Sequence, residues 1–202
     1  MLTYLNNSRT AVIVLHEIYG VNKHIAEACK KIAQNKVDVF CPNILENKPY
    51  TYDQEEVAYE NFINNVGFTK VLNETTELLK SMRSQYDNIC VVGFSVGATV
   101  GWLCSENSNL CDAVIGFYGS RIRNYLDVVP KCPVLLLFPS QEKSFEVDPV
   151  VESLSKKNNV TVKKLSGKHG FADPYSKNYN VESYQEAYKD VFSLMCKMRG
   201  KN

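Results

Sequence analysis

The sequence lacks the features that mark membrane and secreted proteins. No apolar run approaches the roughly 20 residues that a helix needs to cross a bilayer. Residues 1–7 have neither a basic start nor an apolar core, so we expect no signal peptide. The formal net charge is only +1, without an excess of either sign. This balance gives no reason to expect nucleic acid or an anionic membrane as a partner.

Cysteine pairs with metal-binding spacing are also missing. The seven cysteines are an odd number, are scattered along the chain and form no Cys-x-x-Cys pair. This pattern argues against a zinc site and against a disulfide framework. Several of the cysteines fall in predicted strands or helices, where cysteine behaves as a small buried hydrophobic residue. We therefore expect a cytoplasmic protein from a reducing compartment, with no bound metal.

The chain shows no internal repeat, no low-complexity tract and no linker rich in Pro, Gly or Ser. Its content of 45% hydrophobic and 22% charged residues is usual for a soluble globular protein. A chain of 202 residues is long enough to bury a sizeable core. We expect residues 1–202 to form a single domain.

Short apolar runs alternate with amphipathic stretches along the chain. This alternation is typical of an α/β domain with a mainly parallel central sheet flanked by helices. The predicted strands are residues 11–15, 37–43, 89–92, 112–118, 132–138 and 160–165. The predicted helices include residues 54–65, 70–83, 149–157 and 184–195, and the predicted loops include residues 43–52 and 166–174.

A Gly-x-Ser-x-Gly motif at residues 93–97 is the most informative stretch. It follows a predicted buried strand and precedes a predicted helix with small residues on one side. This order of strand, glycine-flanked serine and helix is the setting of a nucleophile elbow. We therefore predict that Ser95 is a nucleophile whose hydroxyl points out of the sheet, with the helix N-terminus behind it favouring a developing negative charge.

A serine hydroxyl is a weak nucleophile at neutral pH and needs a general base. The chain has three histidines. His169 follows the last predicted strand, in a loop from which it can reach over the edge of the sheet. His24 is expected in an exposed helical turn, and His16 ends the first predicted strand. We therefore predict that His169 is the base for Ser95.

An acid that orients the base is expected after the strand that ends at Phe138. Glu142 lies there, and Asp148 is the competing candidate. Asp148 directly precedes Pro149, a pattern that favours a helix N-cap. We therefore predict Glu142 as the acid, within about 3.2 Å of a ring nitrogen of His169. The chain order of serine, acid and histidine is that of α/β-hydrolases.

Four stretches together resemble the dienelactone hydrolase family of the α/β-hydrolase fold. They are His16-Glu17-Ile18-Tyr19-Gly20-Val21-Asn22, Gly93-Phe94-Ser95-Val96-Gly97, Tyr118-Gly119 and His169-Gly170-Phe171. The resemblance extends from about Arg9 over nearly the whole chain, and the combination is far more specific than any single motif.

The resemblance implies an oxyanion hole formed by the backbone N–H groups of Ile18 and Val96. It also places Glu142 where the family usually has aspartate. The namesake enzyme has a cysteine nucleophile where this chain has Ser95, and there the counterpart of Glu17 helps to activate the thiol. Beside a serine, Glu17 is open to other roles, such as orienting the substrate or closing the loop.

Ligands of parallel sheets bind outside the carboxyl ends of the strands. Glu17, Tyr118 and Arg121 follow predicted strands and are therefore candidate substrate contacts. A guanidinium at Arg121 could pair with a substrate carboxylate, and a surface salt bridge is the alternative.

The sequence thus predicts a serine hydrolase that cleaves a carboxylic ester or lactone of a small molecule through an acyl-enzyme, without a cofactor. Two alternatives stay open. The same residues would serve a thioesterase or an acyltransferase, and a non-catalytic protein of this fold would hold a small molecule without turning it over.

Overall fold

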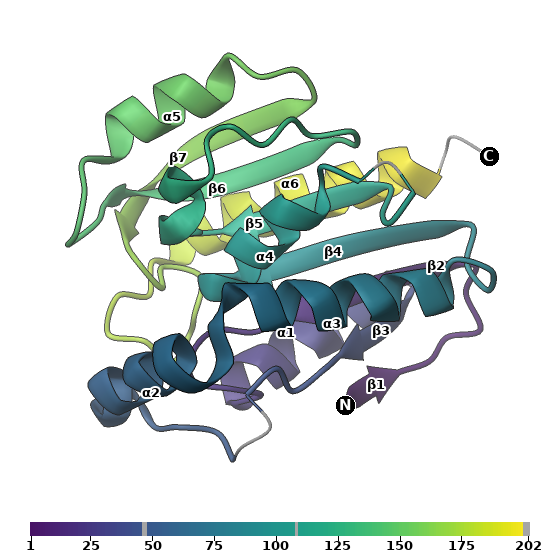
Figure 1. The fold of residues 1–202 in the computed structure, drawn as a ribbon, viewed down its shortest axis with the longest axis horizontal. Coiled ribbons are helices and arrows are strands. Elements are labelled where there is room, and N and C mark those ends of the chain that lie inside the picture. Colours follow the sequence, from purple (N-terminus) through teal and green to yellow (C-terminus); the bar gives the residue numbers. More distant parts are fainter. Residues whose placement is uncertain (46–47, 108, 200–202) are drawn as a thin grey trace.

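The computed structural model describes residues 1–45, 48–107 and 109–199. Its centre is a twisted sheet with helices on both faces (Figure 1). The sheet has the strand order β1-β3-β2-β4-β5-β6-β7, and all neighbours are parallel except β1 and β3. The strands are β1 (Leu2–Tyr4), β2 (Thr10–Leu15), β3 (Asp38–Cys41), β4 (Asn88–Phe94), β5 (Ala113–Phe117), β6 (Val134–Gln141) and β7 (Val160–Lys168).

Two hydrophobic clusters lie on opposite faces of the sheet, because successive side chains of a strand point to opposite faces. One cluster contains residues of α3, α4 and α5, and the other contains residues of α1 and α6. Figure 1 shows α3 and α4 in front of the sheet, α1 and α6 behind it, and α5 beside β7 at the top of the view. The helices are α1 (Lys23–Ala33), α2 (Glu55–Asn61), α3 (Gly67–Met82), α4 (Val96–Cys104), α5 (Val147–Ser155) and α6 (Val181–Arg199).

The central strand β4 is buried along its whole length. Its side chains alternate between the two clusters, with Ile89 and Val91 in one and Cys90 and Val92 in the other. The register pairs Phe94 at its end with Phe117 of β5. The carboxyl ends of adjacent strands therefore meet at one edge of the sheet, where ligands of parallel sheets bind.

The element predictions hold for most of the chain, with differences at their ends. The sequence missed β1, which pairs antiparallel with β3 at the edge of the sheet. The predicted helix at residues 54–65 consists of α2 and a π-helical turn, Phe62–Val66. At Gly67 the backbone leaves the helical conformation, with a φ of 74°, before α3 continues. Residues 166–168, predicted as loop, continue β7. Of the predicted loop at residues 43–52, positions 46–47 lie outside the described residues.

Two expectations about single residues are wrong. His24 was expected to be exposed, but its side chain is 1% exposed in the first turn of α1, and its ring packs against that of Phe94 in an edge-to-face arrangement. Asp148 was expected to cap α5, but the helix begins earlier, at Val147, and its N-cap is Glu146. Val147 is buried, so packing of this apolar side chain sets the start of the helix two residues before the expected position.

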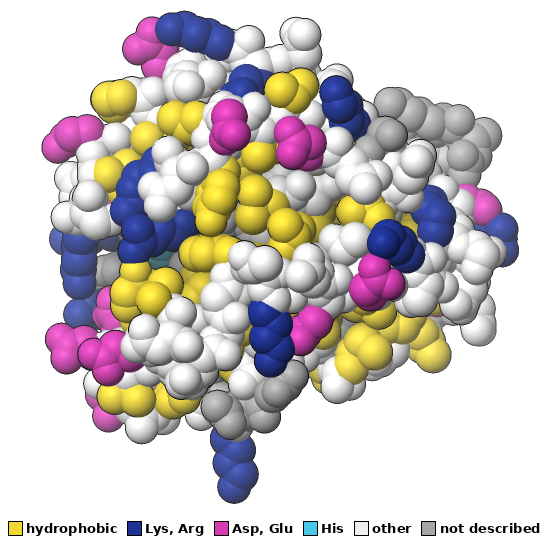
Figure 2. All heavy atoms as spheres, viewed as in Figure 1, with side chains coloured by type: hydrophobic (Ala, Val, Ile, Leu, Met, Phe, Trp, Pro, Cys, Tyr) yellow, Lys and Arg dark blue, Asp and Glu magenta, His cyan; other side chains and the backbone are white. Residues whose placement is uncertain are grey.

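On the face drawn in Figure 2, apolar side chains run across the middle and basic side chains gather toward the left edge. Acidic side chains are scattered around the apolar ones. Cys196 is exposed, and the other cysteines are buried as free thiols, as expected of small hydrophobic residues. Among the described residues, no helix combines the length and the apolar character needed to cross a bilayer.

Candidate active site

The turn between β4 and α4 presents Ser95 at the edge of the sheet. Ser95 has a φ of 52°, a left-handed conformation that non-glycine residues rarely adopt. Its N–H donates to the Phe117 carbonyl oxygen at 2.9 Å, which ties the turn to the end of β5. The side chain is half-buried. The sharp, strained turn of a nucleophile elbow is therefore present at the predicted serine.

The two glycines of the motif are required by the close approach of strand and helix. A Cβ at Gly93 would lie 2.2 Å from the Gly97 carbonyl oxygen. A Cβ at Gly97 would lie 2.2 Å from the Leu15 carbonyl oxygen of β2. Both distances are far below van der Waals contact and involve backbone atoms. The glycines thus let α4 start directly against β2 and β4, with its N-terminus behind Ser95.

His169 lies between Ser95 and Glu142. Its Nε2 is 2.9 Å from Ser95 Oγ, and its Nδ1 is 2.8 Å from Glu142 Oε1. The carboxylate can only accept a hydrogen bond, so Nδ1 carries the proton and Nε2 is free to accept the serine proton. The Glu142 side chain is 5% exposed, whereas that of His169 is 35% exposed. The structure therefore brings the three predicted residues into one hydrogen-bonded line.

The protonation of His169 is set by opposing influences. Burial acts to lower the pKa of His169. The hydrogen bond to Glu142 and the charges of Glu142, Glu17 and Glu55 act to raise it, and together they outweigh burial, so the pKa lies above its ordinary value. The carboxylates around the ring thus stabilise the imidazolium form. A base in this setting accepts a proton more readily than an isolated histidine does.

The competing acid, Asp148, lies elsewhere. Its carboxylate pairs with Lys164 of β7, and its side chain is 75% exposed. It makes no contact with His169 among the described ion pairs and hydrogen bonds. The position next to the imidazole belongs to Glu142.

Val96 directly follows Ser95, and Ile18 lies in the segment after β2, the strand that pairs with β4. Val96 is the first residue of α4, where an N–H has no partner within the helix. Ile18 is the second residue of a turn closed by the hydrogen bond from Gly20 N–H to the Glu17 carbonyl oxygen, so its own N–H is not used by the turn. The turn and the helix therefore leave both N–H groups without a local hydrogen bond among the described residues.

Glu17 and Tyr118 are buried beneath His169. The Tyr118 ring centroid is 4.9 Å from that of His169, and the side chain is fully buried. Burial raises the pKa of the Glu17 carboxyl and of the Tyr118 hydroxyl. The Tyr118 hydroxyl interacts with the Glu17 carboxylate, although neither that hydroxyl nor Glu17 Oε1 has a partner in full hydrogen-bond geometry among the described residues. Both side chains thus form the inner wall of the site.

Sequence reasoning missed two further residues of this wall. Asp173 is 1% exposed and accepts a hydrogen bond from the Tyr52 hydroxyl at 2.6 Å. His24 Nδ1 lies 3.7 Å from the same carboxylate. No local pattern marks these positions, because they are buried only when the loop after β7 packs against α1 and the segment before α2.

Arg121 is half-buried in the short 3₁₀ helix Ser120–Asn124, which follows β5, the strand paired with β4. Its guanidinium donates to the Tyr59 hydroxyl of α2 and lies 5.8 Å from the centroid of that ring. The neighbouring Arg123 lies over the ring of Phe145. Arg121 therefore has an aromatic partner rather than a carboxylate, which leaves its charge unneutralised by an ion pair in the described structure.

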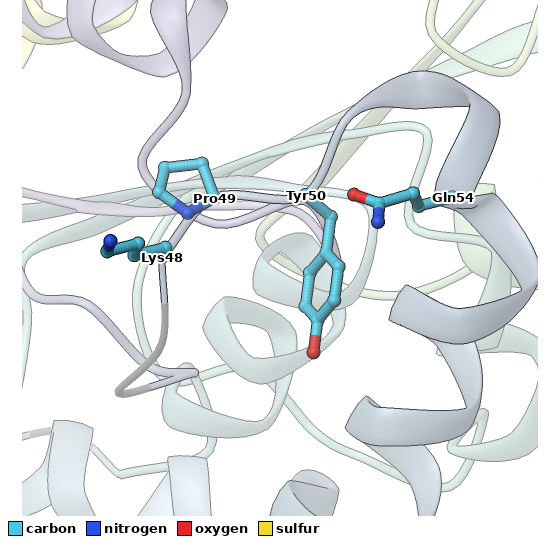
Figure 3. Close-up of a pocket in the computed structure, with 4 residues that line it drawn as sticks. All are labelled: Lys48, Pro49, Tyr50 and Gln54. Carbon is cyan, nitrogen blue, oxygen red and sulfur yellow. The ribbon is translucent and has the colours of Figure 1, made fainter.

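A separate hollow of about 460 Å³ lies beside the start of α2. Figure 3 shows the side chains that line it, those of Lys48, Pro49, Tyr50 and Gln54. The hollow is wide open, and its lining includes none of the residues aligned at Ser95. It is therefore distinct from the site at the elbow. The described residues also include no cluster of three or more His, Cys, Asp or Glu side chains arranged to hold a metal ion.

Comparisons with known proteins give one consistent match. The model of the "Dienelactone hydrolase family" matches residues 2–198. The "Uncharacterized protein YczH" of Bacillus subtilis (strain 168) is 38% identical over 172 residues, which cover 84% of each chain. The "Putative carboxymethylenebutenolidase" of Yersinia pestis is 23% identical over 201 residues, 88% of this chain and 74% of the relative.

Solved structures share the fold. A "Putative Dienelactone Hydrolase" from Klebsiella pneumoniae superposes with a TM-score of 0.74 at 22% identity, covering 91% of this chain and 85% of the other. The "Dienelactone Hydrolase-like Promiscuous Phospotriesterase P91", from metagenomic libraries, superposes with a TM-score of 0.76 at 13% identity. That match covers 95% of this chain and 87% of the other.

Proposed function

This chain belongs to the dienelactone hydrolase family, and we propose that it is a serine hydrolase that cleaves a carboxylic ester or lactone of a small molecule. The predicted α/β-hydrolase fold, with a mostly parallel sheet flanked by helices, is confirmed. The observation that carries the proposal is the hydrogen-bonded line from Ser95 through His169 to Glu142 at a strained strand-to-helix turn. The names of relatives as carboxymethylenebutenolidases and of structural neighbours as esterases support the same bond class.

The first step is the attack of Ser95 on the carbonyl carbon of the substrate. His169 Nε2 is within hydrogen-bonding distance of Ser95 Oγ and takes its proton as the bond forms. The imidazole becomes positively charged, and Glu142 stabilises that charge from the other side of the ring. The buried carboxylate of Glu142 also fixes the ring tautomer, so Nε2 faces the serine before the substrate arrives.

The carbonyl oxygen becomes an oxyanion in the tetrahedral intermediate. The backbone N–H groups of Ile18 and Val96 donate to it, and the N-terminus of α4 adds a favourable dipole. When the intermediate collapses, His169 gives its proton to the leaving alkoxide. Water, deprotonated by the same imidazole, then attacks the acyl-enzyme and releases the acid. No step of this sequence requires a cofactor.

Arg121 is proposed to contact the substrate, and Glu17 and Tyr118 are proposed to shape the site from behind His169. Arg121 follows β5 and carries a positive charge without a carboxylate partner among the described residues, which suits a substrate with an acidic group. Glu17 and Tyr118 are deeply buried. Their place beneath His169 instead suits them to form the wall of the site behind the reacting groups.

A substrate panel tests the proposed function. Purified protein is assayed with activated esters, lactones and thioesters of matched acyl chains, with and without an added alcohol as acceptor. We expect hydrolysis of esters or lactones by the wild type and none by Ser95→Ala. Preferred cleavage of thioesters, or transfer to the alcohol, would instead identify a thioesterase or an acyltransferase. Binding of the same compounds without any turnover would identify a non-catalytic binding protein.

A further inference from the structure

A second imidazole, that of His16, is buried at the start of the turn that contains Ile18. His16 follows the end of β2 and is 0% exposed. Burial lowers its pKa to about 4, although its hydrogen bonds act in the opposite direction. The ring is therefore neutral at physiological pH. The mechanism proposed above gives this histidine no role.

Both ring nitrogens of His16 contact backbone groups, and the Asn43 side chain is a further hydrogen-bond partner of the ring. The Ile44 N–H donates to Nε2 at 3.0 Å. Nε2 must then be unprotonated, so Nδ1 carries the hydrogen of the neutral ring. Nδ1 lies 2.6 Å from the carbonyl oxygen of Glu17, and only Nδ1–H can be the donor in that contact. The imidazole thus bridges Ile44, which follows β3, and Glu17, which follows β2.

The bond to Glu17 acts on the peptide group that contains the Ile18 N–H. In a planar trans peptide, the C=O of one residue and the N–H of the next point in opposite directions. Fixing the Glu17 carbonyl therefore fixes the direction of the Ile18 N–H. The Gly20 N–H also donates to this oxygen, but at 3.2 Å. The shorter contact comes from His16.

We propose that His16 is a positioning residue, which aims the Ile18 N–H at the substrate oxygen through its hydrogen bond to the Glu17 carbonyl. This role rests on the proposed function of the site. It excludes His16 as a general base, because both nitrogens are engaged by the backbone. It also gives the segment after β3 a part in the site, since Ile44 N–H holds the ring from the far side.

Two substitutions separate the halves of the bridge. In His16→Asn, the amide Nδ2 lies near the former Nδ1 and can still donate to Glu17, while the Ile44 N–H loses its acceptor. In His16→Gln, Oε1 reaches toward the former Nε2 and can accept from Ile44, while the donor to Glu17 is lost. The two variants thus keep opposite hydrogen bonds at one buried position.

The variants are compared by the rate at which a fluorophosphonate modifies Ser95, by kcat and KM for an activated ester, and by Tm. Loss of a whole oxyanion-hole donor costs about 10²- to 10³-fold in kcat. We expect His16→Gln to lose about 10- to 100-fold in kcat and in the rate of modification, with KM within about twofold. His16→Asn should keep at least about tenfold more activity than His16→Gln, because it keeps the donor to Glu17. Its Tm should fall, because the buried Ile44 N–H is left unpaired.

Losses that follow Tm in both variants, or a larger loss in His16→Asn, would overturn the positioning role. A ¹⁵N NMR spectrum of the wild type tests the bridge without catalysis, and a hydrogen on Nε2 of His16 would also overturn it. If Ser95 of the wild type does not react with the probe at all, the proposed function fails first and the positioning role falls with it. The proposed function and the positioning role are both supported if Ser95 of the wild type reacts and His16→Gln loses more activity than His16→Asn, with losses that do not follow Tm.

Discussion

The protonation of His169 decides when the proposed enzyme works. The ring must be neutral to accept the Ser95 proton, yet Glu142 and the neighbouring carboxylates favour its charged form. The same carboxylates that make the ring a stronger base therefore restrict it to higher pH. This balance has consequences that single substitutions can test.

The pH profile of the wild type should show one ionisation from His169. Because its pKa is raised above the ordinary value of about 6.5, kcat/KM for a neutral ester should be full above that raised pKa and fall as the pH decreases through it. Steady-state kinetics from pH 4 to 9 measure the profile. A flat profile down to the carboxylate range would contradict the assignment of His169.

Glu142→Gln should change both the height and the position of that profile. Removing the carboxylate removes the main interaction that raises the pKa of His169, so the acid limb should move to lower pH. The plateau of kcat should drop by about 10²- to 10⁴-fold, because the imidazolium and the tautomer lose their support. Asp148→Asn is the matched control, since Asp148 is exposed and pairs with Lys164. Equal losses in the two variants would show that the acid is misassigned.

Arg121→Ala should discriminate between substrates. The guanidinium is held by Tyr59 and not by a carboxylate. If it pairs with an acidic substrate, the substitution should raise KM for a carboxylated ester by about tenfold and leave its neutral analogue within about twofold. Equal effects on the two esters would assign Arg121 to holding α2 in place.

At the scale of elements, the site depends on how closely α4 approaches the sheet. The sequence allowed this turn to be predicted, because the glycine spacing of the elbow follows from local sterics at Gly93 and Gly97. It did not reveal that His24 is buried, because Phe94 and Asp173 bury it from elements distant in the sequence. It also missed β1, whose three residues are too few to show a periodic pattern.

Gly97→Ala should disrupt the elbow, whereas Gly101→Ala in the same helix should not. The new Cβ at position 97 would overlap the Leu15 carbonyl, which belongs to β2 and cannot rotate away. At position 101 the nearest atoms are Val114 and Val91 side-chain carbons at 3.3 Å, and alanine favours the helix. We expect Gly97→Ala to lower the free energy of unfolding by about 1–3 kcal/mol or more. Gly101→Ala should change it by less than about 1 kcal/mol. Urea denaturation of both variants measures the difference, and similar values would contradict the steric argument.

At the scale of the whole molecule, one edge of the sheet collects groups that lie far apart in the sequence. Ser95, Glu142 and His169 were predictable because each follows a strand of a parallel sheet, and such strands end at the same edge. The contacts of His16 were not predictable, because Ile44 reaches it from a loop whose path depends on the packing after β3. The meeting of Ser95, Glu142 and His169 thus follows from the order of the strands, whereas the contacts of His16 follow from tertiary packing.

The central claim is that Ser95 is the nucleophile, and covalent labelling tests it most directly. The wild type and Ser95→Ala are treated with a fluorophosphonate, and the modified peptide is identified by mass spectrometry after digestion. The account predicts one modification per chain, located on Ser95, and none in Ser95→Ala with an unchanged Tm. Modification of another residue, or undiminished labelling of Ser95→Ala, would contradict it.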